Sequence, residues 1–347
     1  MKRLLFALCC VAMLAACAEE DKSTVAKAPE RYGWEEDIPL FGDVECVTVR
    51  EYDADIKFGE VVTELQSTYT YRLNAAGDVV EYVANYGDDS DHEDESVKYE
   101  YNSAGKIIRE VETETYNDYD YYSDDYDYTS EETVTVYKYN AEGLCSQRIY
   151  TYSNGDTYKI TYKYDNKGRE IEKREYDRYG DLEDVRKKKY DAKGNLTEEN
   201  WYDEDGDLWD KRVNTYDKRG NLIEIIDYNS DGSEGSRTTC KYDKAGNCIE
   251  RIYDSEDWKT KSTYKYNAQG LVVAEKLYSD DALYFEGYNK YNAAGGIIEV
   301  KRISHYDDDN SVEIVRTTLD KHNNIVRMEH MDDDRVVEIV EIDITYR

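Results

Sequence analysis

The stretch Tyr216-Asp217-Lys218-Arg219-Gly220-Asn221-Leu222 decides the fold of this chain, because variants of it recur along most of the sequence. The shared pattern is an aromatic residue, then Asp or Asn, two variable residues and Gly. Copies begin at Tyr101, Tyr139, Tyr164, Tyr190, Tyr216, Tyr242, Tyr266 and Tyr291, with degenerate terminal copies at Leu73 and Leu319. From Gly143 onward the glycines of successive motif copies are 24 to 26 residues apart. Such a period indicates an array of repeats that pack on their neighbours.

Each copy has the chemistry of a hairpin turn. Asp217 suits the first position of a type I turn, and Gly220 suits the left-handed position that closes it. The structural turn glycines are Gly105, Gly143, Gly168, Gly194, Gly220, Gly246, Gly270 and Gly295. A weaker second turn, as at Tyr176-Asp177, lies about halfway along several units. We therefore predict an all-β fold, an antiparallel meander of tandem hairpin repeats of about 26 residues.

The number of strands predicts the shape of the sheet. About twenty strands of about eight residues would make a very long sheet, and open twisted sheets rarely pass about ten strands without curling or splitting. We expect a long, curved or coiled repeat sheet.

The turn also predicts which side chains share a face. With a three-residue loop and a Gly bulge, Asp217 pairs with Asn221 and Tyr216 faces Leu222. We name the position of Leu222, two residues after the Gly, the aliphatic slot. Simple alternation then places the acidic residues two positions further along on the same face as the tyrosines. They are Glu81, Glu172, Glu198, Glu224, Glu250 and Glu299.

Composition excludes one class of function. The 347 residues carry 45 Lys and Arg against 78 Asp and Glu, a formal net charge of −33. Nucleic-acid binders need a basic footprint, so nucleic acid is not an expected partner. Leu, Ile, Val and Phe make up under a fifth of the chain, but 37 Tyr and only 2 Pro favour strands over disorder.

The N-terminal sequence resembles a targeting signal. A basic start and a short apolar run precede Leu14-Ala15-Ala16-Cys17, which resembles a bacterial lipobox. The predicted divisions are a lipoprotein signal peptide at 1–16, a lipid-anchored tether at 17–42 with lipidation at Cys17, and a repeat domain at 43–347. The acidic residues after Cys17 resemble the surface-export signal of Bacteroidota lipoproteins. We expect anchoring to the bacterial outer membrane at the cell surface, with its periplasmic face as the alternative.

Two groups of tyrosines are candidate binding residues. The first group consists of tyrosines that recur on one face of the predicted strands, namely Tyr162, Tyr164, Tyr264 and Tyr266. The other belongs to an acidic Tyr/Asp loop at 116–132, where one unit is about twelve residues longer, and comprises Tyr119, Tyr121, Tyr122, Tyr126 and Tyr128. A phenol can stack on the apolar face of a sugar or pack on a protein partner. The alternative for each ring is packing within the sheet.

Catalytic and metal-binding patterns are not apparent. The histidines occur singly, without the spacing of metal ligands. No metal site or cofactor is expected, and the acidic turn at 203–207 lacks the EF-hand pattern, although calcium binding there stays open. Cys240 and Cys248 flank one turn diagonally, where a disulfide is only marginally possible.

The motif at Tyr164, Tyr190 and Tyr216 resembles the YD repeat of Rhs-type and teneurin proteins, over roughly residues 69 to 330. The resemblance implies a hairpin array that coils, and surface or carbohydrate-binding roles. The unit here is longer than the usual YD repeat. We expect a non-enzymatic, surface-facing lipoprotein that binds carbohydrate or protein partners or acts as a scaffold at the envelope. The alternatives are an enzyme that acts on envelope glycans and a structural spacer without a ligand.

Overall fold

The computed structural model describes residues 38–87, 94–120, 125–305, 311–332 and 335–347, of which 116–120 and 125–129 are described for the backbone alone. These residues form strands and turns, and no helix among them is long and apolar enough to cross a membrane. The strands are β1 (Val44–Lys57), β2 (Glu60–Leu73), β3 (Val79–Tyr86), β4 (Asp94–Tyr101), β5 (Ile107–Asp120), β6 (Asp125–Tyr139), β7 (Cys145–Tyr152), β8 (Thr157–Tyr164), β9 (Glu170–Tyr176), β10 (Leu182–Tyr190), β11 (Leu196–Tyr202), β12 (Leu208–Tyr216), β13 (Leu222–Asn229), β14 (Glu234–Tyr242), β15 (Cys248–Ser255), β16 (Lys259–Tyr266), β17 (Val272–Ser279), β18 (Ala282–Tyr291), β19 (Ile297–Ser304), β20 (Val312–Leu319), β21 (Ile325–Asp332) and β22 (Arg335–Tyr346).

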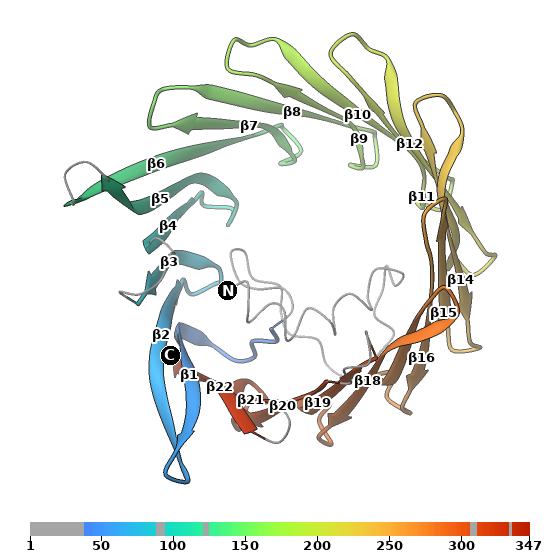
Figure 1. Ribbon diagram of the computed structural model, residues 1–347. Helices are drawn as coiled ribbons and strands as arrows, with labels where there is room; N and C mark the ends of the chain where they lie inside the picture. Colours follow the sequence, from blue (N-terminus) through green and yellow to red (C-terminus); the bar gives the residue numbers. More distant parts are fainter. Residues whose placement is uncertain (1–37, 88–93, 121–124, 306–310, 333–334) are drawn as a thin grey trace.

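The strands close into one antiparallel barrel (Figure 1). Each strand pairs with its successor in the chain, and β22 returns to pair with β1, for example at Val49↔Ile342. The prediction of an all-β hairpin array is therefore right, but the prediction of a long, curved or coiled repeat sheet is wrong, because the sheet closes on itself. Closure removes the two edge strands of an open sheet, whose unpaired backbone groups would otherwise be exposed.

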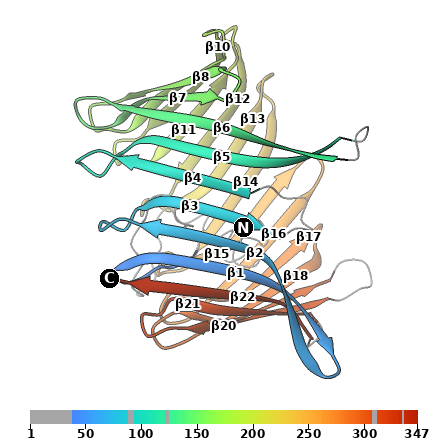
Figure 2. The same cartoon turned by 90° about the vertical axis from the view of Figure 1, so that its left-hand side faces the viewer.

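The turns of the repeat motif gather at one end of the barrel. The motif turns, from 74–77 to 320–323, each follow an even-numbered strand, so they lie together at one end, which we name the primary rim. The weaker second turns, such as those at 177–180 and 203–206, follow odd-numbered strands. The connections that follow odd-numbered strands lie at the opposite end, the secondary rim (Figure 2). The start of β1 and the end of β22 meet at the primary rim, where Val44 pairs with Tyr346.

The two faces of the wall differ in chemistry. A buried apolar cluster runs from β19 through the β22–β1 seam to β4, and it includes Val47, Tyr71, Val300 and Met328. Leu40, in the segment that leads into β1, packs into this cluster, and Figure 1 shows that segment inside the ring. We therefore name the face that carries the cluster the inner face. The motif tyrosines and the aliphatic slots share this face.

The register confirms one expectation about the faces and corrects another. Tyr216 lies opposite Leu222, and the Asp217 N–H donates to the Asn221 carbonyl at 2.9 Å, as predicted. The register then shifts by one residue, so that Thr215 lies opposite Glu224. The predicted acidic row is therefore on the outer face rather than beside the tyrosines. A bulge adds one residue, and one residue is enough to reverse the face of every later side chain.

On the outer face the acidic row pairs with basic residues of the neighbouring strand. The closest atoms are 2.6 to 2.9 Å apart in Arg72–Glu81, Lys163–Glu172, Lys189–Glu198, Lys241–Glu250 and Lys290–Glu299. The basic partners are largely exposed, so each pair contributes at most about 1 kcal/mol to stability. These pairs line part of the outer face with exposed charged side chains.

The long unit forms an extended hairpin. Strands β5 and β6 stay paired out to Asp120↔Asp125, well beyond the pairing of their outer neighbours. The side chains of residues 116–129, which include all five candidate tyrosines of the predicted Tyr/Asp loop, lie outside the described residues, as do residues 1–16 and Cys17.

Candidate functional site

The primary rim is grooved between successive hairpins. Neighbouring units are joined by pairing that starts two residues after the aliphatic slot, as at Glu198↔Val213 between β11 and β12. The aliphatic slot itself, Leu196, therefore has no strand partner on that side. Successive turns separate at the rim, and a groove opens between them.

The motif tyrosine bridges the base of each groove. The Tyr190 hydroxyl donates to the Glu170 carbonyl at 2.8 Å, and the Tyr216 hydroxyl donates to the Leu196 carbonyl at 3.0 Å. Each acceptor is the aliphatic-slot residue of the preceding unit. All eight regular motif tyrosines make this bond, and the remaining pairs are Tyr101–Val79, Tyr139–Ile107, Tyr164–Cys145, Tyr242–Leu222, Tyr266–Cys248 and Tyr291–Val272. The tyrosine thus supplies a hydrogen bond where the backbone ladder has ended. We name this set the tyrosine ladder.

Two of the grooves are open pockets of measurable volume. One, of about 750 Å³, lies between the turn at 140–143 and the turn at 165–168. The other, of about 640 Å³, lies between the turn at 243–246 and the turn at 267–270. They occupy the same place in two units that are four repeats apart.

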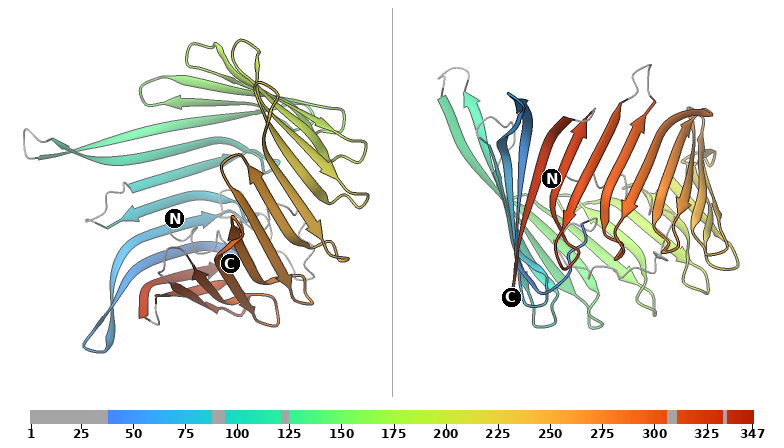
Figure 3. Two further views of the ribbon diagram at one scale, coloured as in Figure 1. Left: turned by 45° about the vertical axis from the view of Figure 1, so that its right-hand side comes forward. Right: turned by 90° about the horizontal axis from the view of Figure 1, so that it is seen from below.

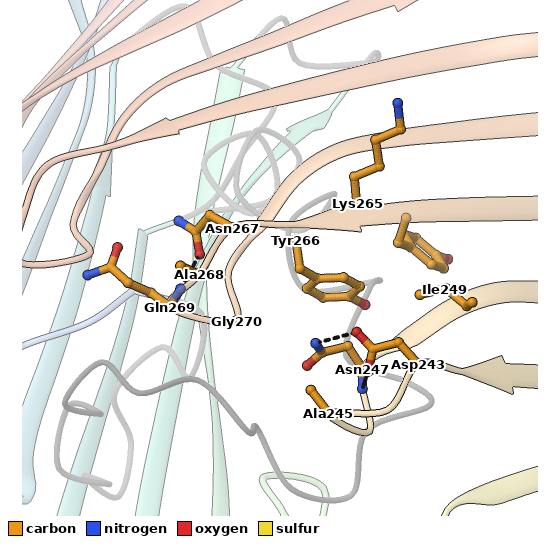
Figure 4. A pocket seen from close by; sticks show the side chains of 11 residues that line it. Asp243, Ala245, Asn247, Ile249, Lys265, Tyr266, Asn267, Ala268, Gln269 and Gly270 are labelled. Atoms are coloured by element: carbon orange, nitrogen blue, oxygen red, sulfur yellow. Dashed lines mark hydrogen bonds between the residues drawn. The ribbon is translucent and has the colours of Figure 1, made fainter.

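The grooves bring together four predicted binding residues in two pairs. Tyr162 and Tyr164 line the first groove, whereas Tyr264 and Tyr266 line the second. Figure 4 shows the ring of Tyr266 above the turn that carries Asp243, with Lys265 pointing away. The four tyrosines are half-buried. They therefore form two equivalent sites instead of one patch.

The hydroxyls of Tyr164 and Tyr264 stay protonated at neutral pH. Burial raises the pKa of Tyr164 to about 12 and that of Tyr264 to about 12. The Tyr164 hydroxyl donates to the backbone carbonyl of Cys145, and the Tyr266 hydroxyl donates to the backbone carbonyl of Cys248. A ligand in either groove would therefore meet the ring faces of Tyr164 and Tyr266 more than their hydroxyls.

The turns supply rigid polar walls. The Asp217 carboxylate accepts hydrogen bonds from the backbone N–H groups of Arg219 and Asn221, and from the Asn221 side chain. Burial alone would raise the pKa of Asp217, but these hydrogen bonds lower it overall. In the first groove, the Arg169 guanidinium lowers the pKa of Asp165 to about 2. These carboxylates stay charged and hold the turns in one shape.

The turn glycines have the backbone conformation that their positions require. All eight have positive φ, from +73° at Gly105 to +104° at Gly194. Residues other than Gly rarely adopt positive φ.

Sequence reasoning missed the tyrosine ladder and an acidic cavity on the inner face. The cavity, of about 390 Å³, is lined by Glu110, Glu112, Glu114, Tyr150 and others. Burial, and then the charges of Glu114 and Glu110, raise the pKa of Glu112. The alternation of Glu with Val and Thr over 110–114 was the available signal, because it places every acid on one face.

The remaining sequence expectations concern cysteine and metal chemistry. Cys46, Cys145, Cys240 and Cys248, in the described part of the chain, are not joined by disulfide bonds. Within those same residues there is no group of three or more His, Cys, Asp or Glu placed to hold a metal ion. His330 is buried beside Glu338, with its Nδ1 3.5 Å from a carboxylate oxygen.

Comparison with known proteins shows likeness only at the level of structure. No family model matches the sequence, and no curated protein does. The alignment with the crystal structure of TcdB2-TccC3-Cdc42 covers 82% of this chain and 15% of the matched chain, at 14% identity and a TM-score of 0.43. The alignment with the crystal structure of a porin-like protein from Bacteroides uniformis covers 87% of this chain and 98% of the matched chain, at 12% identity and a TM-score of 0.31. This chain thus spans a small fraction of the first of these proteins.

Proposed function

We propose that the protein is a non-catalytic binding module that holds neutral carbohydrate in the grooves of the primary rim. The observation that carries the proposal is the repeated groove, in which two tyrosine rings lie between two polar turns. An aromatic ring packs on the apolar face of a sugar, while amide and carboxylate groups at its edge accept or donate hydrogen bonds to hydroxyls.

Charge narrows the class of ligand. The chain has a net charge of −33, and the turn carboxylates beside the grooves stay ionised. Anionic glycans would therefore be repelled, whereas neutral glycans would not. Two equivalent grooves on one rigid barrel would also favour a ligand with repeated units, because the second contact becomes intramolecular.

We further propose that a lipid on Cys17 holds the module at the outer surface of the bacterial envelope. This part rests on the lipobox and on the acidic residues that follow it. A barrel with a charged exterior fits a site in water beside the membrane.

A glycan array with the full chain tests the binding function. The double variant Tyr162→Leu and Tyr264→Leu keeps apolar volume in both grooves, removes two rings, and leaves the tyrosine ladder intact. We expect it to bind a neutral glycan hit at least tenfold more weakly, which corresponds to about 1.4 kcal/mol. The matched control is Tyr288→Leu, because Tyr288 is an exposed tyrosine of β18 outside both grooves. Equal weakening in both variants, or the absence of any glycan hit, would contradict the proposal.

A further inference from the structure

The hairpin of β1 and β2 projects beyond the barrel wall (Figures 1 and 3). Pairing of β1 with β22 ends at Asp53↔Glu338, and pairing of β2 with β3 ends at Ser67↔Tyr86. The two strands stay paired with each other out to Lys57↔Glu60. Residues 54–65, which we name the projecting ribbon, are therefore two-stranded, and no other described strand pairs with either edge.

The tip of the ribbon exposes an aromatic ring at a conformational cost. Phe58 has φ of +58° and Gly59 has φ of +85°, which suits a two-residue turn of the I′ type. Asn or Gly is the usual residue at the first of these positions, because a bulky side chain is strained there. Phe58 is nevertheless present and fully exposed. Neither local conformation nor burial in the barrel accounts for this residue.

The two faces of the ribbon are chemically distinct. Ile56 pairs with Val61 and Ala54 with Thr63, so these residues share one face. Exposure of the large apolar side chains is close to half, at 47% for Ile56 and 50% for Val61. The other face carries Asp53, Asp55, Lys57, Glu60, Val62 and Glu64. The ribbon thus has a mainly apolar face and a mainly acidic face.

The free edges offer hydrogen bonds. Lys57 and Glu60 flank the two-residue turn and form a hydrogen-bonded pair, so the next pair, Ile56 and Val61, directs its N–H and C=O groups away from the ribbon. On the β1 edge the Ile56 N–H donates to the Asp55 carboxylate at 2.7 Å, whereas on the β2 edge the outward N–H and C=O groups belong to Val61 and Thr63 of the apolar face. A strand added at the β2 edge would place alternate side chains on the apolar face and on the acidic face.

We propose that the projecting ribbon is a docking element for an extended segment of a protein partner, in which apolar and basic side chains alternate. Strand addition satisfies the free edge, the apolar side chains cover Ile56 or Val61, and the basic side chains meet the acidic face. A second copy of this chain is a poor occupant, because its ribbon carries the same acidic face and the chain carries a net charge of −33. This proposal does not depend on glycan binding at the primary rim.

The probe is a capped ten-residue peptide of alternating Val and Lys, titrated into the full chain and followed by fluorescence anisotropy. We expect saturable binding that weakens with added salt. Hydrogen exchange should slow in residues 54–65. Two peptides serve as controls, one with Glu in place of Lys, and one N-methylated at alternate residues so that it cannot complete the ladder. Both should bind at least tenfold more weakly.

A variant pair tests the location. Ile56→Thr combined with Val61→Thr keeps β-branched strand formers and removes the apolar contact, and we expect at least tenfold weaker binding. Val337→Thr, at an exposed valine of β22, is the matched control and should leave binding unchanged. Equal binding of the peptides, equal binding of the two variants, or dimerisation through the ribbon without peptide would overturn the proposal. The peptide controls need no variant, so they stand even if a variant fails to fold.

Discussion

Removing one hydroxyl from the tyrosine ladder tests the structural role of the repeat motif. In Tyr190→Phe the ring stays, and only the hydrogen bond of 2.8 Å to the Glu170 carbonyl is lost. A neutral hydrogen bond contributes about 0.5–1.5 kcal/mol net, and leaving a buried acceptor unsatisfied costs about 1–3 kcal/mol. Tyr190 is half-buried at an open rim, where water can reach the carbonyl in part. We therefore expect a loss of about 1 kcal/mol in the free energy of unfolding.

Urea unfolding measures this loss through the transition midpoint at constant slope. A second substitution, Tyr242→Phe, removes an equivalent bond two repeats away. Sites so far apart should be additive, which gives about 2 kcal/mol for the double variant. Tyr288→Phe removes a hydroxyl from an exposed ring outside the ladder and should change stability by less than about 0.5 kcal/mol. If all three tyrosines gave the same small change, the hydroxyls would not hold the rim together.

Three further experiments test other features. Cys17→Ser should move the protein from the membrane fraction to the soluble fraction, because stable attachment depends on buried acyl chains, and unchanged fractionation would exclude lipidation there. Gly220→Val should lower stability by more than about 1 kcal/mol in urea unfolding, because Gly220 has φ of +90°, while Lys218→Ala in the same turn should be nearly silent; equal shifts would refute the turn assignment. Burial raises the pKa of Glu275 to about 7, although Arg302 opposes the shift. A carboxyl group whose pKa is higher in the folded state stabilises the fold at pH values below its unfolded-state pKa, and this stabilisation is lost as the pH rises through its folded-state pKa. The parent protein should therefore lose stability between about pH 4.5 and 7 relative to Glu275→Gln. Parallel pH profiles of the two proteins would contradict this assignment.

The position of the candidate site shows where sequence reasoning stopped. Tyr164 and Tyr266 could be recognised as strand residues beside a turn, and they could be placed on one face with the aliphatic slots. Alternation alone could not show that neighbouring hairpins separate at the rim. That depends on where pairing between units begins, as at Gln147↔Thr161 and Glu250↔Thr263, which no residue of the motif encodes by itself.

The acidic row shows how a local irregularity limits such reasoning. Glu198 and Glu250 were expected beside the tyrosines, and the structure places them on the outer face with Lys189 and Lys241. The shift at each turn adds one residue to one strand, for example between Lys189 and Tyr190. Strand alternation has a period of two, so a single added residue exchanges the two faces.

The sequence by itself determined the local structure, because the information is local. The Asp-x-x-Gly turns, the two strands of each unit and the pairing of Tyr216 with Leu222 all follow from interactions within a few residues. Closure of the barrel was decided only by the tertiary structure. It depends on the curvature summed over the 22 strands of the described residues, which brings Val44 of β1 to Tyr346 of β22. A small change in twist per strand would leave an open coil from the same repeats, so no single repeat can specify a closed ring.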